Sequence, residues 1–304
     1  MQIKFKINKV SNYLTILINK MYNISNKEDI ILNKEFFILN NGVKIPKIGF
    51  GTWQIPNGDV CYNAVLSALN NSYRHIDSAV MYGNEESVGK AVKDFKIDRS
   101  EIFITTKVPA SIKSYQETKE IIKKSLNLLD LEYIDLLLIH HPKPWDKRDS
   151  PKTYNEENIE VYKAMEEAYN EGLIKSIGVS NFNIDQLKNL MENVKIKPMV
   201  NQIRYFIGST SNDLVTFCKE NDILVQAYSP LATGRLLDNN EIKKIASKYN
   251  KTLPQLAIRY CLENDILPLP KSVHDEYIKA NIDVDFTISK EDMNFLNLLK
   301  DTVI

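Results

Sequence analysis

Short apolar segments alternate with amphipathic segments from about residue 36 to the C-terminus. Eight of the apolar segments are mostly hydrophobic throughout and lack the polar alternation of a half-exposed strand. Such segments are typical of strands buried on both faces, as in a parallel sheet. The eight predicted strands cover residues 45–53, 74–79, 101–108, 133–141, 174–181, 199–205, 223–230 and 266–273.

The segments between these strands carry apolar residues at helical spacing. The segment 155–172 opens with acidic side chains and closes on Gly172, which suits the helix dipole and a glycine C-cap. The segment 252–265 has a proline near its start, where a helix tolerates the missing N–H. Further helices of this kind are predicted over residues 114–130, 183–194 and 211–222.

Strands that alternate with helices predict an α/β fold, and eight such units most simply form a (β/α)8 TIM barrel. Two β-prone runs around Asn40-Asn41-Gly42 add an N-terminal β-hairpin. A doubly wound dinucleotide-binding sheet is the alternative. Its fingerprint needs a third glycine and an immediate helix, and GFGTWQ (49–54) supplies neither. No break in composition divides the barrel, so we predict one domain over residues 35–304.

Residues 1–34 differ from the rest of the chain, because they are rich in Lys and Asn and have only a short apolar patch. They lack the apolar core of a signal peptide and the Arg of an amphipathic targeting sequence. We expect a disordered tail, or a start assigned too early with Met21 as the alternative start. No apolar run approaches the length of a membrane span. We therefore expect a cytoplasmic protein without a membrane partner.

The composition narrows the function classes. The chain has 304 residues with 39 basic and 39 acidic side chains, which argues against a protein built mainly to bind nucleic acid. Its three cysteines are widely spaced and suit a reducing compartment better than a disulfide framework. The adjacent pair His140-His141 would face opposite sides of a strand, and no cysteine lies at ligand spacing. We expect no metal site.

Ionisable residues end three successive predicted strands: Asp77, Lys107 and His140. In a (β/α)8 barrel the C-terminal strand ends form the active site, so these side chains can point at one mouth. Asp77 and Lys107 would lie on neighbouring strands and can neutralise each other. Tyr82 lies within loop reach, and we expect the Lys107 ammonium to lower its pKa and make it a general acid. Each residue alone is more often structural; together they indicate a proton-transfer site.

The motifs around these residues resemble those of the aldo-keto reductases, in the same order along residues 36–301. The resemblance is to bacterial-type members that act on aldehydes or 2,5-diketo-gluconate. The motifs are GFGTWQ (49–54), RHIDSAVMYGNEESVGKAV (74–92), ITTKV (104–108), YIDLLLIHHP (133–142), GLIKSIGVSNF (172–182), NQIRY (201–205), QAYSPLATGRL (226–236) and PKSVHDEYIKANIDV (270–284).

The resemblance implies an enzyme that reduces carbonyl compounds to alcohols with NAD(P)H. Tyr82 would donate the proton, and Lys107, paired with Asp77, would lower the pKa of Tyr82. His140 would orient the carbonyl. Ser180, Asn181 and Gln202 match positions that hold the nicotinamide carboxamide, and Tyr228 matches the ring on which the nicotinamide stacks. The resemblance also implies that Ser229, Leu231, Lys271, Ser272 and Asn281 bind the rest of the cofactor.

The last motif departs from the family pattern, because Tyr277 stands where an Arg that grips the 2′-phosphate is expected. A tyrosine can stack on adenine but cannot offer a charged fork to phosphate. We therefore expect NADPH as cofactor with a weakened preference over NADH. The substrate would meet Trp53, His140 and His141, with Trp145 at the mouth. The chain ends soon after its last helix, which suggests an open pocket and broad aldehyde reduction.

Two other functions remain open. A cofactor-binding barrel with little turnover could regulate a larger assembly. A Schiff-base aldolase could use Lys107 as its nucleophile, although this leaves Gln202 and Tyr228 unexplained. We expect a monomer whose partner is a small carbonyl compound.

Overall fold

The computed structural model describes residues 36–303, so the predicted tail of residues 1–34 lies outside the described residues. Eight strands form one sheet in which neighbours along the chain pair in parallel. They are β3 (Phe50–Gly51), β4 (His75–Asp77), β5 (Phe103–Val108), β6 (Leu136–Ile139), β7 (Ile177–Ser180), β8 (Val200–Arg204), β9 (Leu224–Tyr228) and β10 (Leu267–Leu269).

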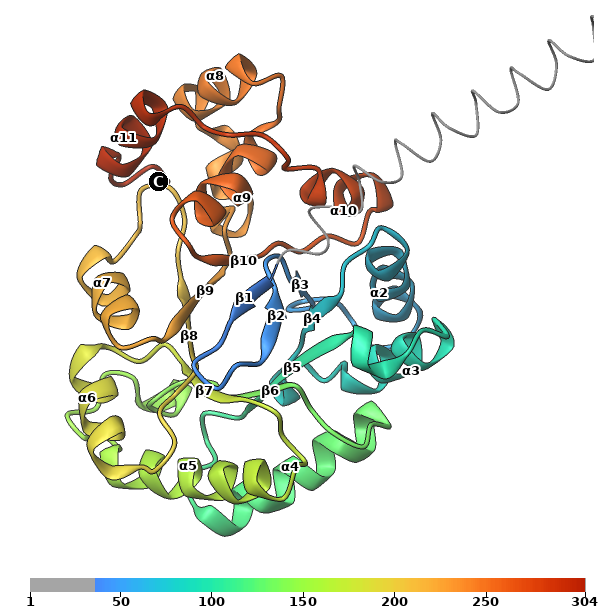
Figure 1. Ribbon diagram of the computed structural model, residues 1–304, viewed down its shortest axis with the longest axis vertical. Helices are drawn as coiled ribbons and strands as arrows, with labels where there is room; N and C mark the ends of the chain where they lie inside the picture. Colours follow the sequence, from blue (N-terminus) through green and yellow to red (C-terminus); the bar gives the residue numbers. More distant parts are fainter. Residues whose placement is uncertain (1–35, 304) are drawn as a thin grey trace, which may run out of the picture. The chain divides into compact units, whose positions relative to one another are not determined.

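The sheet closes on itself through backbone hydrogen bonds between its first and last strands. The Gly49 amide donates to the Pro268 carbonyl at 3.0 Å, and the Gly51 amide donates to the Pro270 carbonyl at 2.9 Å. Helices form the outer ring around the strands (Figure 1). The predicted (β/α)8 barrel is therefore confirmed.

Local signals in the sequence explain where several helices begin and end. Ser114 caps the helix after β5, and Thr252 and Gln255 form a capping box at the helix before β10. Gly172 follows its helix with a φ of 79°, as a glycine C-cap requires. The helices are α2 (Asp59–Asn70), α3 (Glu85–Asp94), α4 (Tyr115–Leu129), α5 (Asn155–Asn170), α6 (Ile184–Asn193), α7 (Asn212–Glu220), α8 (Asn240–Lys248), α9 (Leu253–Glu263), α10 (Asp275–Ile282) and α11 (Lys290–Leu298).

The predicted hairpin consists of β1 (Phe36–Ile38) and β2 (Lys44–Pro46), joined by a turn in which Gly42 has a φ of 84°. Two asparagine side chains of this turn fix the hairpin to the barrel. Asn40 donates to the carbonyls of Pro198 and Asp222, and Asn41 donates to the carbonyl of Lys175. These carbonyls precede strands, so the hairpin lies across the N-terminal end of the barrel (Figure 1). The opposite end is left for the site.

The bounds of the first predicted strand, residues 45–53, are wrong. The run 45–53 contains the end of β2 and, after a turn, the two residues of β3. Both pieces are apolar and buried, Ile45 on the hairpin and Phe50 in the barrel. Hydrophobicity therefore could not divide them, and only the pairing partners distinguish the hairpin from the barrel.

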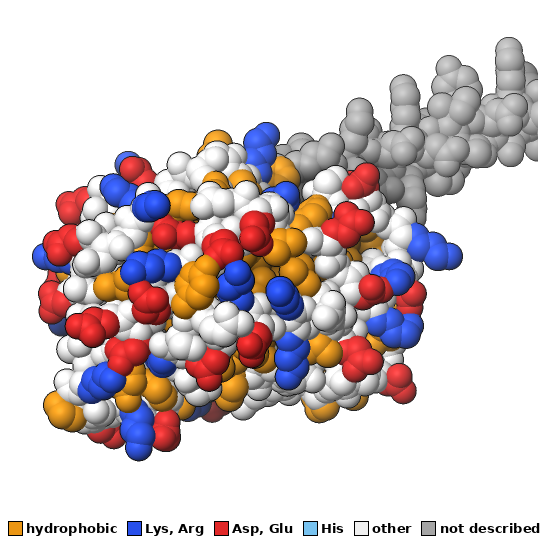
Figure 2. All heavy atoms as spheres, turned by 90° about the horizontal axis from the view of Figure 1, so that it is seen from below, with side chains coloured by type: hydrophobic (Ala, Val, Ile, Leu, Met, Phe, Trp, Pro, Cys, Tyr) orange, Lys and Arg blue, Asp and Glu red, His pale blue; other side chains and the backbone are white. Residues whose placement is uncertain are grey.

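Acidic and basic side chains are interspersed over the face shown in Figure 2, in keeping with the zero net charge. Within residues 36–303, no helix is long and apolar enough to cross a membrane. The same residues contain no cluster of His, Cys, Asp and Glu side chains that could hold a metal ion. All three cysteines are buried and free.

Candidate active site

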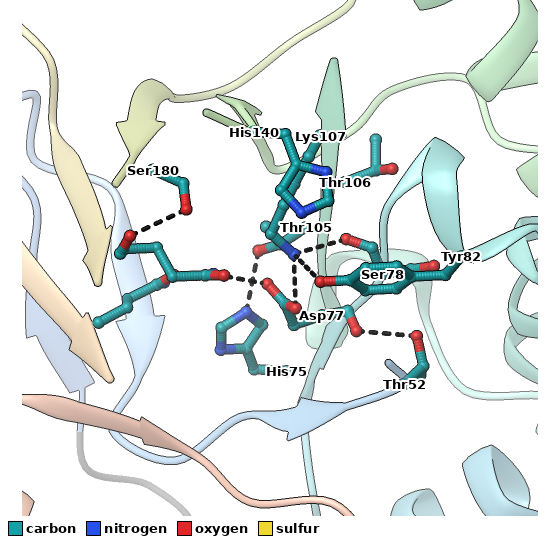
Figure 3. A network of polar contacts seen from close by, with 12 residues as sticks. Thr52, His75, Asp77, Ser78, Tyr82, Thr105, Thr106, Lys107, His140 and Ser180 are labelled. Carbon is teal, nitrogen blue, oxygen red and sulfur yellow. Dashed lines mark hydrogen bonds and ion pairs between the residues drawn. The ribbon is translucent and has the colours of Figure 1, made fainter. Parts of the chain in front are cut away.

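A buried ion pair joins the C-terminal ends of β4 and β5 (Figure 3). The Lys107 ammonium is 2.6 Å from Oδ1 of Asp77, and the two side chains are 0% and 5% exposed. The ion pair predicted from neighbouring strand ends is therefore present. Buried charges of this kind are stable only when each is compensated by the other and by hydrogen bonds.

All three hydrogens of the Lys107 ammonium have an acceptor. Besides Asp77, it donates to the Ser78 carbonyl at 2.8 Å and to the Tyr82 hydroxyl oxygen at 3.4 Å. Because the Tyr82 oxygen accepts from Lys107, its own hydrogen is free to be donated elsewhere. Tyr82 ends a single 3₁₀ turn, η1 (Val80–Tyr82), which follows β4 and turns the hydroxyl towards Lys107 (Figure 3).

The pKa of Tyr82 is raised well above its usual value, first by burial and then by the charge of Asp77. The expectation that Lys107 lowers this pKa is therefore wrong for the site as it stands. Asp77 already neutralises the Lys107 ammonium, so burial outweighs it. The phenol is held in its protonated form, which is the form that a proton donor needs.

His140 follows β6 and lies beside Tyr82, with ring centroids 5.6 Å apart and planes at 76°. Burial lowers the pKa of His140 to about 3, and the positive charge of Lys107 contributes in the same direction. The imidazole is therefore neutral at pH 7. Its Nδ1 is buried and has no partner among the described residues. A neutral imidazole can donate one hydrogen bond to a carbonyl oxygen without adding a charge.

Gln202 on β8 forms a hydrogen bond with the Asp77 carboxylate of the ion pair. Its amide nitrogen donates to Oδ2 of Asp77 at 2.8 Å and to Oε1 of Gln226 at 2.9 Å. Gln226 on β9 is fully buried and was missed from the sequence. The sequence does contain a signal for Gln226: it is a polar residue two positions before Tyr228, on the same face of an otherwise apolar strand.

A second network joins the ends of β7 and β9. The Tyr228 hydroxyl donates to Oδ1 of Asn181 at 2.8 Å, and Nδ2 of Asn181 donates to Ser180 Oγ and to the His140 carbonyl. Asn181 has a φ of 65°, a left-handed conformation that these bonds hold in place. Three predicted cofactor residues, Ser180, Asn181 and Tyr228, are thus linked to the backbone of His140.

The other predicted cofactor residues lie beyond strands β9 and β10. The turn after β9 holds Ser229 and Leu231, and the segment after β10 holds Lys271 and Ser272. Asn281 is buried on α10. None of these five makes a hydrogen bond or ion pair with Asp77, Tyr82, Lys107 or His140 in the described structure.

The predicted substrate residues lie on two sides. Trp53 follows β3 and is 46% exposed, while the ring of His141 contacts that of Trp145, with centroids 4.4 Å apart. Trp145 also packs edge-on against His140, at 5.5 Å and 87°. Trp145 therefore forms a wall directly beside His140, and His141 supports that wall.

Residues 47–300 match the model of the aldo/keto reductase family. The chain belongs to this family. It is an oxidoreductase, and its Asp77, Tyr82, Lys107 and His140 lie together at the mouth of the barrel that the family resemblance implied.

Relatives of this aldo/keto reductase cover nearly all of the barrel. Glyoxal reductase from Bacillus subtilis is 39% identical over 262 residues, which is 86% of this chain and 91% of the relative. The crystal structure of an aldo-keto reductase from a deep-sea metagenome library is 43% identical, with a TM-score of 0.81 over 89% of this chain and 96% of that one. A Bombyx mori aldo-keto reductase in complex with NADP is 32% identical, with a TM-score of 0.79 over 89% and 94%.

Two buried histidines of this reductase make its stability depend on pH. Burial lowers the pKa of both His75 and His140 to about 3, whereas an unfolded histidine titrates near ~6.5. Between these values the unfolded chain binds more protons, so the free energy of unfolding rises with pH. Each histidine contributes up to ~1.4 kcal/mol per pH unit in this window.

Urea unfolding at a series of pH values tests this dependence. We expect His75→Gln to reduce the slope of stability against pH between about pH 4 and 6. An unchanged slope in this variant would show that His75 is not kept neutral by burial.

Proposed function

We propose that this protein reduces aldehydes and ketones to alcohols with a nicotinamide cofactor, and that Tyr82 donates the proton. The observation that carries the proposal is the hydrogen bond from Lys107 to the Tyr82 oxygen, which leaves the phenolic hydrogen free. His140, neutral and 5.6 Å away by ring centroids, supplies a second hydrogen bond to the carbonyl oxygen. Asp77 holds Lys107 in place and balances its charge.

The residues around the mouth fit a dinucleotide. Tyr228 offers a ring whose hydroxyl is fixed by Asn181. Within the described residues, Arg204 and Lys271 are exposed cations without a carboxylate partner, and they suit the phosphates. The cofactor supplies the hydride. The name of the Bombyx mori relative's complex supports NADP as the dinucleotide.

The contacts of Lys107 favour reduction over Schiff-base chemistry. A nucleophilic lysine needs a free amine, whereas the Lys107 ammonium donates to Asp77, Ser78 and Tyr82. A regulatory barrel is the remaining alternative, and turnover distinguishes it. The test follows NADPH absorbance with glyoxal and with a reactive aromatic aldehyde. We expect multiple turnovers; tight NADPH binding without turnover would support the regulatory role.

Cofactor preference gives a separate prediction. Tyr277 on α10 is 57% exposed, and its ring packs edge-on against His274 at 5.6 Å. It offers no charge to a 2′-phosphate, so we expect NADPH to be preferred over NADH by less than about a thousandfold, ~4 kcal/mol. Tyr277→Arg should raise this preference, because a guanidinium can form a charged fork with phosphate.

The measurement is the ratio of kcat/KM for NADPH and NADH with one aldehyde. Tyr277→Phe is the matched control, because it keeps the ring and adds no charge, and its ratio should equal that of the wild type. A wild-type preference above a thousandfold, or no gain in Tyr277→Arg, would contradict the prediction.

A further inference from the structure

The loop after β6 contains Arg148, whose guanidinium lies over Trp145, the residue that forms the wall beside His140. Trp145 packs edge-on against His140, as described above, and the Arg148 guanidinium carbon lies 5.8 Å from the centroid of the Trp145 ring. Only two successive ring contacts therefore separate this guanidinium from His140. The position suits a group that meets the far end of a substrate whose carbonyl reaches Tyr82 and His140.

Arg148 has no acidic partner among the described residues, although acids lie close by in the sequence. Asp146 is paired with Lys147 at 3.6 Å. Asp149 is exposed and forms no ion pair with Arg148. A guanidinium that lies over an aromatic ring still has N–H groups that can donate to an anion. Arg148 can therefore bind a planar anion.

Two lysines add positive charge, Lys113 beside the loop and Lys143 within it, and neither forms an ion pair in the described structure. Lys113 donates to the His141 carbonyl and to Oδ1 of Asn158, and Lys143 donates to the Ser150 carbonyl. Burial lowers the pKa of Lys113 to about 8, which leaves it mostly charged at pH 7. Glu157, whose negative charge acts on Lys113, is itself paired with Lys152.

The electrostatic effect of these cations is visible at His141. Its pKa is lowered first by burial; the backbone hydrogen bond with Lys143 raises it, and the positive charges of Lys113, Arg148 and Lys143 lower it. Three cations therefore act on His141 beside the wall of the site, and cations so placed favour the binding of an anion.

We propose that Arg148, held on the ring of Trp145, binds an anionic group at the end of the substrate remote from the carbonyl, and that carboxylate-bearing aldehydes are the preferred substrates. This rests on the proposed carbonyl reduction. Arg148 is exposed, so its effect is that of a surface ion pair, about fivefold or ~1 kcal/mol. The effect is expected in KM, because the anion is bound equally before and during reaction.

The experiment compares 4-carboxybenzaldehyde with its neutral methyl ester, methyl 4-formylbenzoate, at pH 7 with saturating NADPH. We expect a higher kcat/KM for the acid in the wild type. Arg148→Gln should lower the acid-to-ester ratio of kcat/KM about fivefold, through a higher KM for the acid. Arg148→Lys should keep most of the ratio, and added salt should reduce it in the wild type.

Lys147→Gln is the matched control, because Lys147 is an exposed cation of the same loop that is paired with Asp146. Its acid-to-ester ratio should equal that of the wild type. No preference for the acid in the wild type, or a ratio in Arg148→Gln within twofold of the wild type, would overturn the proposal. If the wild type oxidises no NADPH with either aldehyde, the proposed function fails first and this inference with it.

Discussion

Tyr82→Phe is expected to lower kcat for aldehyde reduction by about a hundredfold to ten thousandfold, the range of general acid catalysis. The variant keeps the ring that packs against His140 and loses only the hydroxyl beside Lys107. Cofactor binding and the free energy of unfolding should therefore change little. The measurements are steady-state turnover and NADPH titration on the same preparations.

Tyr162→Phe is the matched control for this prediction. Tyr162 on α5 is fully buried, and its hydroxyl has no hydrogen-bond partner among the described residues. Removing that hydroxyl should leave kcat unchanged, since it forms no hydrogen bond with a residue of the site. Wild-type turnover in Tyr82→Phe would remove Tyr82 as the proton donor.

The raised pKa of Tyr82 adds a pH dependence to the same assay. An acid that titrates above its usual value, near ~10, stays protonated throughout the neutral range. We therefore expect no loss of kcat from Tyr82 ionisation below about pH 9. Protonation of His140 near pH 3 lies below the assay range as well.

Lys107→Met is expected to reduce the free energy of unfolding by ~3–5 kcal/mol, because it leaves the Asp77 carboxylate buried without its counter-ion. Gln202 still donates to Oδ2, but one neutral hydrogen bond does not replace an ammonium. Activity should also be lost, because Tyr82 loses its neighbour. Urea unfolding and the aldehyde assay measure the two effects separately.

The double variant Asp77→Asn with Lys107→Met is the control. It removes both charges, so much of the lost stability should return, whereas activity should not. Equal stability of the single and double variants would mean that the charge of Asp77 is not the cause. A single variant within about 1 kcal/mol of the wild type would contradict the burial of the pair.

The sequence alone was sufficient to predict those contacts of the site that follow from the order of the strands. Asp77 and Lys107 end neighbouring strands, and parallel strands bring their C-terminal ends to one edge, so their contact could be predicted. His140 ends the next predicted strand and Tyr82 lies within loop reach of Asp77, so both were expected at the same mouth, and the family resemblance then implied their roles. The positions of the three strand ends depend on topology alone, which the alternation of strands and helices predicts.

Features that depend on three-dimensional packing could not be predicted in this way. The net effect on the pKa of Tyr82 depends on how deeply its hydroxyl lies and on whether Lys107 is already paired. The contact between Gln202 and Gln226 depends on side-chain rotamers inside the barrel. The position of Arg148 on Trp145 depends on the path of a loop, for which the sequence has no periodic signal.

The closure of the barrel constrains the order in which the chain can fold during synthesis. The bonds from Gly49 and Gly51 reach Pro268 and Pro270, and the hairpin asparagines bond to carbonyls 134 to 182 residues away. The first strands to leave the ribosome must therefore wait for the last. Until β10 emerges, the edges of the sheet at β3 and at β9 both stay unpaired and open to association with other chains. Translation that pauses before residue 267 would prolong this exposure.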